Sequence, residues 1–181
     1  EKVEGRSLPI SSNAMFTKSN VIIGINPGWR YLGLAVLNGT DLRDWRIKVV
    51  SGKTLHEKEN YLSVHIAKLI DQYHLSAVAL KALHASRCSQ PLKALVAAIE
   101  RQLNEKQVPI FRYSIGEIKN ILMPEKKRSN KMMLCNVLAS NYPALYQKLN
   151  REGVIKNSYY TRMFEAVACG VVCLRLRQFK S

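Results

Sequence analysis

The stretch VIIGINPG, residues 21–28, is the part of the sequence that decides the fold. Its first five residues form a short, largely β-branched apolar run, which is typical of a buried strand. Asn26-Pro27-Gly28 follows at once and indicates a turn where that strand ends. Residues 31–37 predict a second strand, Asn38-Gly39 is a strong hairpin signal, and residues 45–50 supply a third strand. The sequence therefore predicts an antiparallel meander at this point.

Beyond the meander, the hydrophobic period alternates between that of a helix and that of a strand. Helices are predicted at residues 55–73, 92–103, from Ser114 over a short length, at about 129–141 and at 160–177, with strands at 74–80 and 108–113. Residues 146–158 are polar, and we expect them to be irregular. The order βββ-α-β-α-β-α-α-α indicates an α/β fold, with a mixed five-stranded sheet and helices on both of its faces.

The composition combines an ordinary apolar share with a strong excess of positive charge. The 181 residues are 47% hydrophobic, and 28 Lys and Arg against 13 Asp and Glu give a net charge of +15. The apolar share excludes a disordered chain, and the charge favours a polyanion, either nucleic acid or an acidic membrane face. No apolar run is long enough to span a membrane, and we see no secretory signal, so we expect no membrane association.

The start of the chain is expected to lie outside the fold. Ser12-Asn13-Ala14 directly before Met15 resembles a cloning scar, so residues 1–14 are interpreted as a leader and 15–181 as one domain. The four cysteines form no C-x-x-C pair and have no zinc-like spacing with histidine. We expect them to be reduced, mostly buried thiols, which fits a cytoplasmic protein.

An ordered set of motifs resembles the RuvC-type Holliday-junction resolvases, which belong to the RNase H-like superfamily. Residues 23–33 carry Asn-Pro-Gly where the first strand of that family ends in Asp-Pro-Gly, and residues 76–81 are similar to its fourth strand. Residues 108–119 resemble the fifth strand and the following helix, 130–133 the lysine-led start of the next helix, and 165–168 the last helix. The likeness spans about residues 20–178 and implies an RNase H-like domain that forms a homodimer, for which we expect contact through the helix near 91–105.

The resemblance implies a nuclease site in which clustered carboxylates hold two Mg²⁺ ions. At the matching positions this chain has Asn26 for the first Asp, Lys81 for the strand-four Glu, and Arg162 with Glu165 for the last-helix Asp pair. Four carboxylates of the family thus become one amide, two cations and one carboxylate, and an ammonium group close to a Mg²⁺ position repels the ion.

No carboxylate is available as a substitute on the two strands concerned. Neither residues 20–37 nor residues 72–99 contain Asp or Glu, so a small shift of register restores no ligand. From this we expect no catalytic residues, no metal and no cofactor. The resulting interpretation is a protein that is not an enzyme and that binds branched or structured nucleic acid without cleaving it.

Two alternatives exist for the altered site residues. Lys81 and Arg162 lie where the family's metals would meet a phosphate, so they could bind a phosphate directly. Equally, Arg162 could pair with Glu165 three residues along the helix, and Lys81 could pair with the same carboxylate to keep the fold intact. Trp29 is either a core residue or a stacking platform, and the sequence does not decide between them.

Further cations are candidates for contact with nucleic acid, for which we expect branched DNA. His84 stands where the family often has a stacking aromatic, and Lys119 and Lys131 match lysines that approach DNA in the family. The full predicted set of binding residues is Lys81, His84, Arg87, Lys119, Lys126, Lys127, Arg128 and Lys131. Two rival interpretations remain: a scaffold subunit that no longer binds nucleic acid, and an active junction nuclease with relocated metal ligands.

Overall fold

The structure is a computed structural model that describes residues 20–84, 86, 88–125, 130–154 and 159–178. The leader expected at residues 1–14 lies outside these residues, as do Arg87, Lys126, Lys127 and Arg128 of the predicted binding set. The strands are β1 (Val21–Asn26), β2 (Tyr31–Asn38), β3 (Asp41–Val49), β4 (Ala77–Lys81) and β5 (Ile110–Tyr113). The helices are α1 (Leu55–Tyr73), α2 (Gln90–Glu105), α3 (Ile115–Leu122), α4 (Lys131–Asn141), the 3-10 turn η2 (Pro143–Leu145), α5 (Tyr146–Val154) and α6 (Tyr159–Gln178).

The five strands form one mixed sheet in the order β3-β2-β1-β4-β5. The first three strands pair antiparallel, whereas β4 joins β1 and β5 joins β4 in parallel. The predicted α/β fold with its mixed sheet is therefore confirmed. The Asn38-Gly39 turn is also confirmed, because Gly39 has a φ of +56°, which glycine adopts without a steric penalty.

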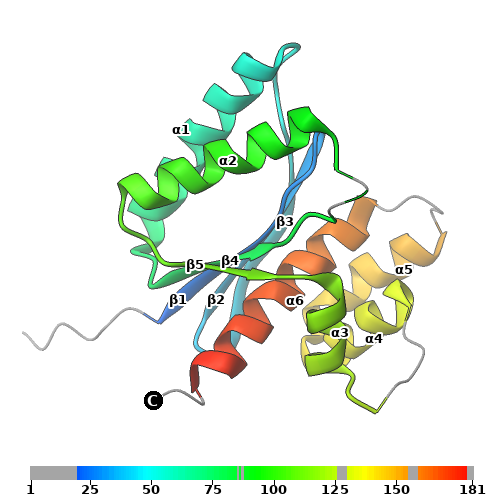
Figure 1. Cartoon of the computed structure of the whole chain (residues 1–181). Coiled ribbons are helices and arrows are strands. Elements are labelled where there is room, and N and C mark those ends of the chain that lie inside the picture. The colour runs from blue at the N-terminus through cyan, green and yellow to red at the C-terminus, as the bar shows by residue number, and fades with distance from the viewer. Residues whose placement is uncertain (1–19, 85, 87, 126–129, 155–158, 179–181) are drawn as a thin grey trace, which may run out of the picture.

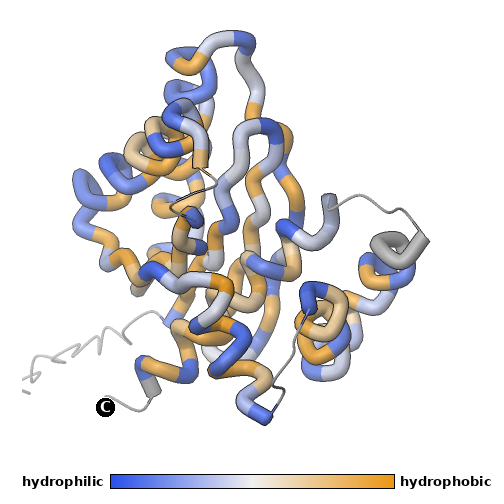
Figure 2. The backbone as a smooth tube through the Cα atoms, turned by 45° about the vertical axis from the view of Figure 1, so that its right-hand side comes forward, coloured by the Kyte–Doolittle hydropathy of each residue, from blue (hydrophilic) through white to orange (hydrophobic). Residues whose placement is uncertain are grey.

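Helices cover both faces of the sheet, as Figure 1 shows. Alternate strand residues point to opposite faces, so Ile23 and Ile25 pack toward α1 and α2, while Ile22 packs toward α6. On the second face α6 lies directly against the sheet, and α3, α4 and α5 flank it. In Figure 2 the outer helices alternate between hydrophilic and hydrophobic residues, as expected for helices with one buried side.

Helix α6 approaches the sheet so closely that only glycine fits at two contact points. A Cβ atom on Gly24 of β1 would lie 1.9 Å from the carbonyl oxygen of Ala166, and one on Gly33 of β2 would lie 2.2 Å from that of Arg162. The small residues Ala77 and Ala79 of β4 face the same helix and are fully buried. This close approach fixes the position of α6, and with it the side chains that α6 carries toward the strand ends.

Two elements differ from the sequence-based expectations. Residues 146–158 were expected to be irregular, but α5 occupies Tyr146–Val154. Leu145 is buried and Leu149 packs against the core four residues later, so tertiary packing stabilises a helix that the polar composition hides. Strand β3 begins at Asp41 instead of residue 45, because its exposed polar residues mask the alternation of a one-sided edge strand.

Local sequence signals that set the helix starts are confirmed. Ser114 and Glu117 form the expected capping box of α3, and Pro91 lies in the first turn of α2. The apolar stripe of α2 is buried against the sheet of its own chain through Leu95, Ile99 and Leu103. None of the helices in the described ranges combines the length and the apolar character that a membrane span needs.

Candidate functional site

The ends of two neighbouring parallel strands bring the first two site residues together. Ile25 of β1 pairs with Leu80 of β4, so the residues that follow them, Asn26 and Lys81, reach the same edge of the sheet. Side chains alternate between the two faces of a strand, and both residues occupy positions whose side chains face α6. The sequence motif Asn-Pro-Gly ends β1 here, and the turn that it forms leaves this edge open for side chains.

Glu165 on α6 is the centre of the polar cluster at this edge. Its side chain is 3% exposed, and its Oε2 atom accepts a hydrogen bond of 2.8 Å from Nδ2 of Asn26. The ammonium group of Lys81 donates to the same oxygen and forms an ion pair with it. Because burial of an unpaired carboxylate is very unfavourable, these two donors account for how α6 can carry Glu165 into the interior.

The second oxygen of Glu165 is less well satisfied. Oε1 is buried and has no hydrogen-bond partner among the described residues, and the ammonium group of Lys131 lies 3.6 Å from it. Lys131 is the first residue of α4, and its side chain remains 59% exposed. One carboxylate therefore lies between two ammonium groups, of which one is largely buried and the other faces the solvent.

Arg162 makes a contact other than the expected helical ion pair. Its guanidinium group donates to the backbone carbonyl of Pro27 at 3.3 Å, while its own carbonyl accepts from Nδ2 of Asn26 at 3.3 Å. The pair with Glu165 is not among the ion pairs of the described residues. Of the two structural pairings that the sequence left open, the one between Lys81 and Glu165 is therefore confirmed and the one through Arg162 is not.

A cavity of about 220 Å³ opens directly in front of this cluster. Its lining includes Asn26, Lys81, His84 and Arg162, which are all residues that the sequence analysis singled out. Ser114 also lines it, because β5 pairs with β4 up to Tyr113 and so ends at the same edge. The sequence indicated Ser114 only as a helix cap, and its position after the fifth strand was the signal that could have placed it here.

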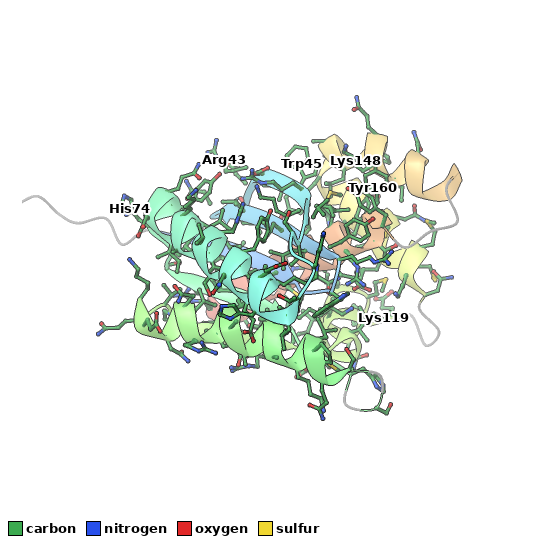
Figure 3. The ribbon with its side chains drawn as sticks, turned by 90° about the horizontal axis from the view of Figure 1, so that it is seen from above. Arg43, Trp45, His74, Lys119, Lys148 and Tyr160 are labelled. Atoms are coloured by element: carbon green, nitrogen blue, oxygen red, sulfur yellow. The ribbon has the colours of Figure 1, made fainter. Side chains whose placement is uncertain are left out.

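The remaining predicted residues lie at different distances from this cavity. His84 is exposed at its rim, with Nδ1 within 3.0 Å of Oγ of Ser86. Lys119 lies one turn along α3 from Ile115, which lines the cavity, and Figure 3 labels its side chain. Trp29 packs against the core of the α1 face, and the ammonium group of Lys58 lies 5.1 Å from its ring centroid. Trp29 is therefore a packed residue beside a cation.

The described side chains do not fit a pair of magnesium ions. Mg²⁺ requires several hard, anionic oxygen ligands, and the cluster offers one carboxylate that is already paired with Lys81. Asn26 turns its amide nitrogen, a donor, toward that carboxylate. Across the described residues, no group of three or more His, Cys, Asp or Glu side chains is close enough together to hold a metal ion.

The cysteines are not among the residues that line this cavity. Cys135, Cys169 and Cys173 are buried free thiols, and Cys88 is half-buried near the start of α2. Burial raises the pKa of both the Cys169 and the Cys173 thiol, so these groups stay protonated and unreactive at neutral pH.

Comparisons with known proteins find relatives only at the level of structure. No protein-family model matches the sequence, and no curated protein matches it. The structure of Thermus thermophilus RuvC matches with a TM-score of 0.68 and 17% identity, over 88% of this chain and 96% of that one. The same protein in complex with a Holliday junction substrate matches with a TM-score of 0.66 and 18% identity, over 87% and 95%. The yeast mitochondrial Holliday junction resolvase Ydc2 matches with a TM-score of 0.65 and 11% identity, over 89% and 80%.

These matches correct one expectation from the sequence. The prediction that this chain is not an enzyme is contradicted, because the proteins with similar structures are Holliday junction resolvases, which are nucleases. The lack of a metal-binding group among the described residues carries no conclusion about activity. At these identities the likeness is one of fold, and the chain has the RuvC-like form of the RNase H fold.

Proposed function

We propose that this chain binds branched, junction-type nucleic acid at the edge of the sheet where β1, β4 and β5 end. The observation that carries the proposal is the cavity lined by Lys81, Arg162 and His84 on a chain of net charge +15. A phosphate is the natural ligand for the guanidinium group of Arg162 at this cavity, whereas the charge of Lys81 is largely taken up by Glu165.

The charges around the cavity support an anionic ligand. The buried carboxylate of Glu165 is already compensated by Lys81, so it offers little repulsion to a phosphate. Arg162 lines the cavity, and the largely exposed Lys131 adds positive charge near Glu165. Among the described residues, the guanidinium group of Arg162 donates to the neutral carbonyl of Pro27 and forms no ion pair, so its charge remains available to an anionic ligand.

The structural neighbours favour a branched ligand over a linear one. One of them is RuvC of Thermus thermophilus in complex with a Holliday junction substrate, and its fold covers 87% of this chain. The rival scaffold interpretation accounts for Lys81 through its ion pair with Glu165, but it leaves the charge of Arg162 at the cavity without a role.

A binding series tests the proposal. Fluorescence anisotropy is measured for labelled four-way junction, duplex, single strand and RNA hairpin at low salt, and we expect the junction to bind most tightly. The variant Arg162→Gln should weaken junction binding about tenfold, the loss expected for one charged contact of about 1.4 kcal/mol. Arg175→Gln, at the other end of the same helix, is the matched control and should bind as the unchanged protein does.

The same samples, incubated with Mg²⁺ and separated on a denaturing gel, measure cleavage directly. Failure of the unchanged protein to bind any nucleic acid at low salt would contradict the proposal and favour the scaffold. Equal loss of binding in Arg162→Gln and Arg175→Gln would show that the charge acts over the whole surface and not at the cavity.

We include a homodimer in this proposal. A symmetric dimer presents two copies of one surface, which suits a ligand with several equivalent arms. Because the apolar stripe of α2 is used inside its own chain, contact through α2 would have to use its outer residues, such as Lys93 and Arg101. Light scattering of the free protein and of the junction complex measures the mass of each, and a monomer in both would contradict this part.

A further inference from the structure

A second cavity of about 220 Å³ lies where the edge strand β3 meets the first turns of α6. It is lined by Trp45 and Arg46 from β3, Lys148 from α5, and Tyr159, Tyr160 and Met163 from α6. Figure 3 shows Trp45, Lys148 and Tyr160 gathered on one side of the molecule. We call this the aromatic cavity.

The rings of the aromatic cavity form a connected set. Tyr159 and Tyr160 meet edge to face with centroids 5.0 Å apart, and Tyr159 meets Tyr31 in the same way at 4.9 Å. The ammonium group of Lys148 lies 5.4 Å from the centroid of Tyr160. A cation beside aromatic rings is the combination that proteins use to hold an unpaired nucleotide, with the base against a ring and the phosphate near the cation.

The size of the cavity limits what it can hold. Pockets that enclose whole drug-sized ligands measure about 300–1,000 Å³, so a smaller cavity suits a single planar group. Arg46 is held in an ion pair with Asp44, so Lys148 is the cation that we assign to the ligand's phosphate. Among the described residues that line the cavity none is acidic, which favours an anionic ligand.

The aromatic cavity lies close to the candidate site along α6. Tyr159 precedes Arg162 by three residues, and residues at that spacing lie on neighbouring positions of one helix side, with an axial rise of about 4.5 Å. Arg162 lines the first cavity and Tyr159 lines the second. A strand that leaves a phosphate at Arg162 would therefore meet the aromatic cavity within a short distance.

We propose that the aromatic cavity binds one unpaired base of a nucleic-acid strand, stacked against Trp45 or Tyr160 with its phosphate near Lys148. This inference rests on the proposed function, since it adds a second contact for the same class of ligand. It differs from that function in requiring a base that is free of its partner strand.

The first experiment uses Trp45 as a reporter. The sequence has two tryptophans, so the variant Trp29→Phe leaves Trp45 as the sole indole. A 15-nucleotide thymidine strand should quench the emission of this variant, whereas an abasic strand of equal length and charge should bind without quenching. Equal quenching by both strands would overturn the inference, because the cavity would then contact only the backbone.

The second experiment changes the ring of Tyr160. Tyr160→Leu should weaken binding of the thymidine strand about 5- to 150-fold, the range for loss of one base–ring stacking contact, and Tyr160→Phe should keep binding within about twofold. The matched control is Tyr146→Leu, an exposed tyrosine on α5 that does not line the cavity. Thermal unfolding shows whether each variant folds. If Tyr160→Leu does not fold, the quenching experiment with Trp45 tests the inference instead.

A fully paired four-way junction separates this inference from the proposed function. If the junction binds every variant equally while Tyr160→Leu loses the single strand, the inference is supported. If the junction binds but the thymidine strand never quenches Trp45, the inference is wrong and the proposed function stands. Quenching by a poly-glutamate peptide equal to that by the thymidine strand would also overturn it, in favour of an acidic protein partner.

Discussion

Lys81 and Glu165 are 84 residues apart in the sequence, yet they form an ion pair between the end of β4 and the middle of α6. The carboxylate is 3% exposed and the lysine side chain 20% exposed. Removing one partner of such a pair leaves a charge in the interior without compensation, whereas replacing both by apolar groups is often neutral. The pair is therefore a structural contact whose stability effect can be measured apart from any binding role.

The first prediction concerns this ion pair. Lys81→Met should lower the free energy of unfolding by about 2 kcal/mol, less than the roughly 3–5 kcal/mol of a fully buried pair, because part of Lys81 faces the solvent. The double variant Lys81→Met with Glu165→Leu should recover most of the loss. Urea denaturation measures both, with Lys131→Ala as a control that should change stability by less than about 0.5 kcal/mol. Unchanged stability in Lys81→Met would show that the pair does not support the fold.

The second prediction concerns the contact between β1 and α6. Gly24→Ala should destabilise the protein by about 1–3 kcal/mol or prevent folding, because its Cβ would lie 1.9 Å from a backbone oxygen that cannot move freely. Gly116→Ala on α3 is the matched control, since the nearest atom to its Cβ would be 3.8 Å away. There the change should stabilise the protein by roughly 0.5–1 kcal/mol through helix propensity. Thermal unfolding compares the two, and equal effects would contradict the close approach of α6.

The third prediction concerns the buried thiols. Burial raises the pKa of Cys169 and Cys173 in the folded protein, whereas unfolded cysteines ionise near their ordinary pKa of about 8.5. The stability that these thiols contribute is therefore fully present below about pH 8.5 and declines as the pH rises toward the folded pKa values.

Alkylation tests the burial that raises these pKa values. At pH 8, iodoacetamide followed by mass spectrometry should modify the half-buried Cys88 first, and Cys169 and Cys173 only after unfolding in urea. Alkylation of Cys169 as fast as that of Cys88 in the folded protein would show that α6 is not buried as described.

The fold was accessible from the sequence because its signals are local. The β-branched run at residues 21–25, the Asn38-Gly39 turn and the Ser114–Glu117 capping box each specify structure within a few residues, and each is confirmed. Helix α5 could not be predicted, because Leu145 and Leu149 stabilise it by packing on elements that are remote in the sequence.

Only part of the site could be predicted from the sequence, because some of its contacts join residues that are far apart in the chain. The resemblance to the family motifs assigned Asn26, Lys81 and Glu165 to one site, and in the structure they meet. The contact between Arg162 and the carbonyl of Pro27 depends on how α6 is positioned by Gly24 and Gly33, which no periodic pattern reveals. The aromatic cavity combines residues from β3, α5 and α6, so no single motif could indicate it.

The last prediction concerns the salt dependence of binding. If lysines contact phosphates, each neutralised phosphate contributes about −0.9 to the slope of log K against log salt on duplex arms. Changing Lys126, Lys127, Arg128 and Lys131 to alanine together should therefore flatten that slope by several units, although the first three lie outside the described residues. Lys131→Ala alone should flatten it by about 0.9, since its side chain is 59% exposed beside the candidate site. Anisotropy titrations from low to moderate salt supply the slopes, and two unrelated junction sequences should change alike because phosphate contacts do not read bases.

Lys106→Ala, at the far end of α2 and paired with Asp71, is the control that should leave the slope unchanged. A slope that is equally steep in the quadruple variant would place the phosphate contacts elsewhere on the protein.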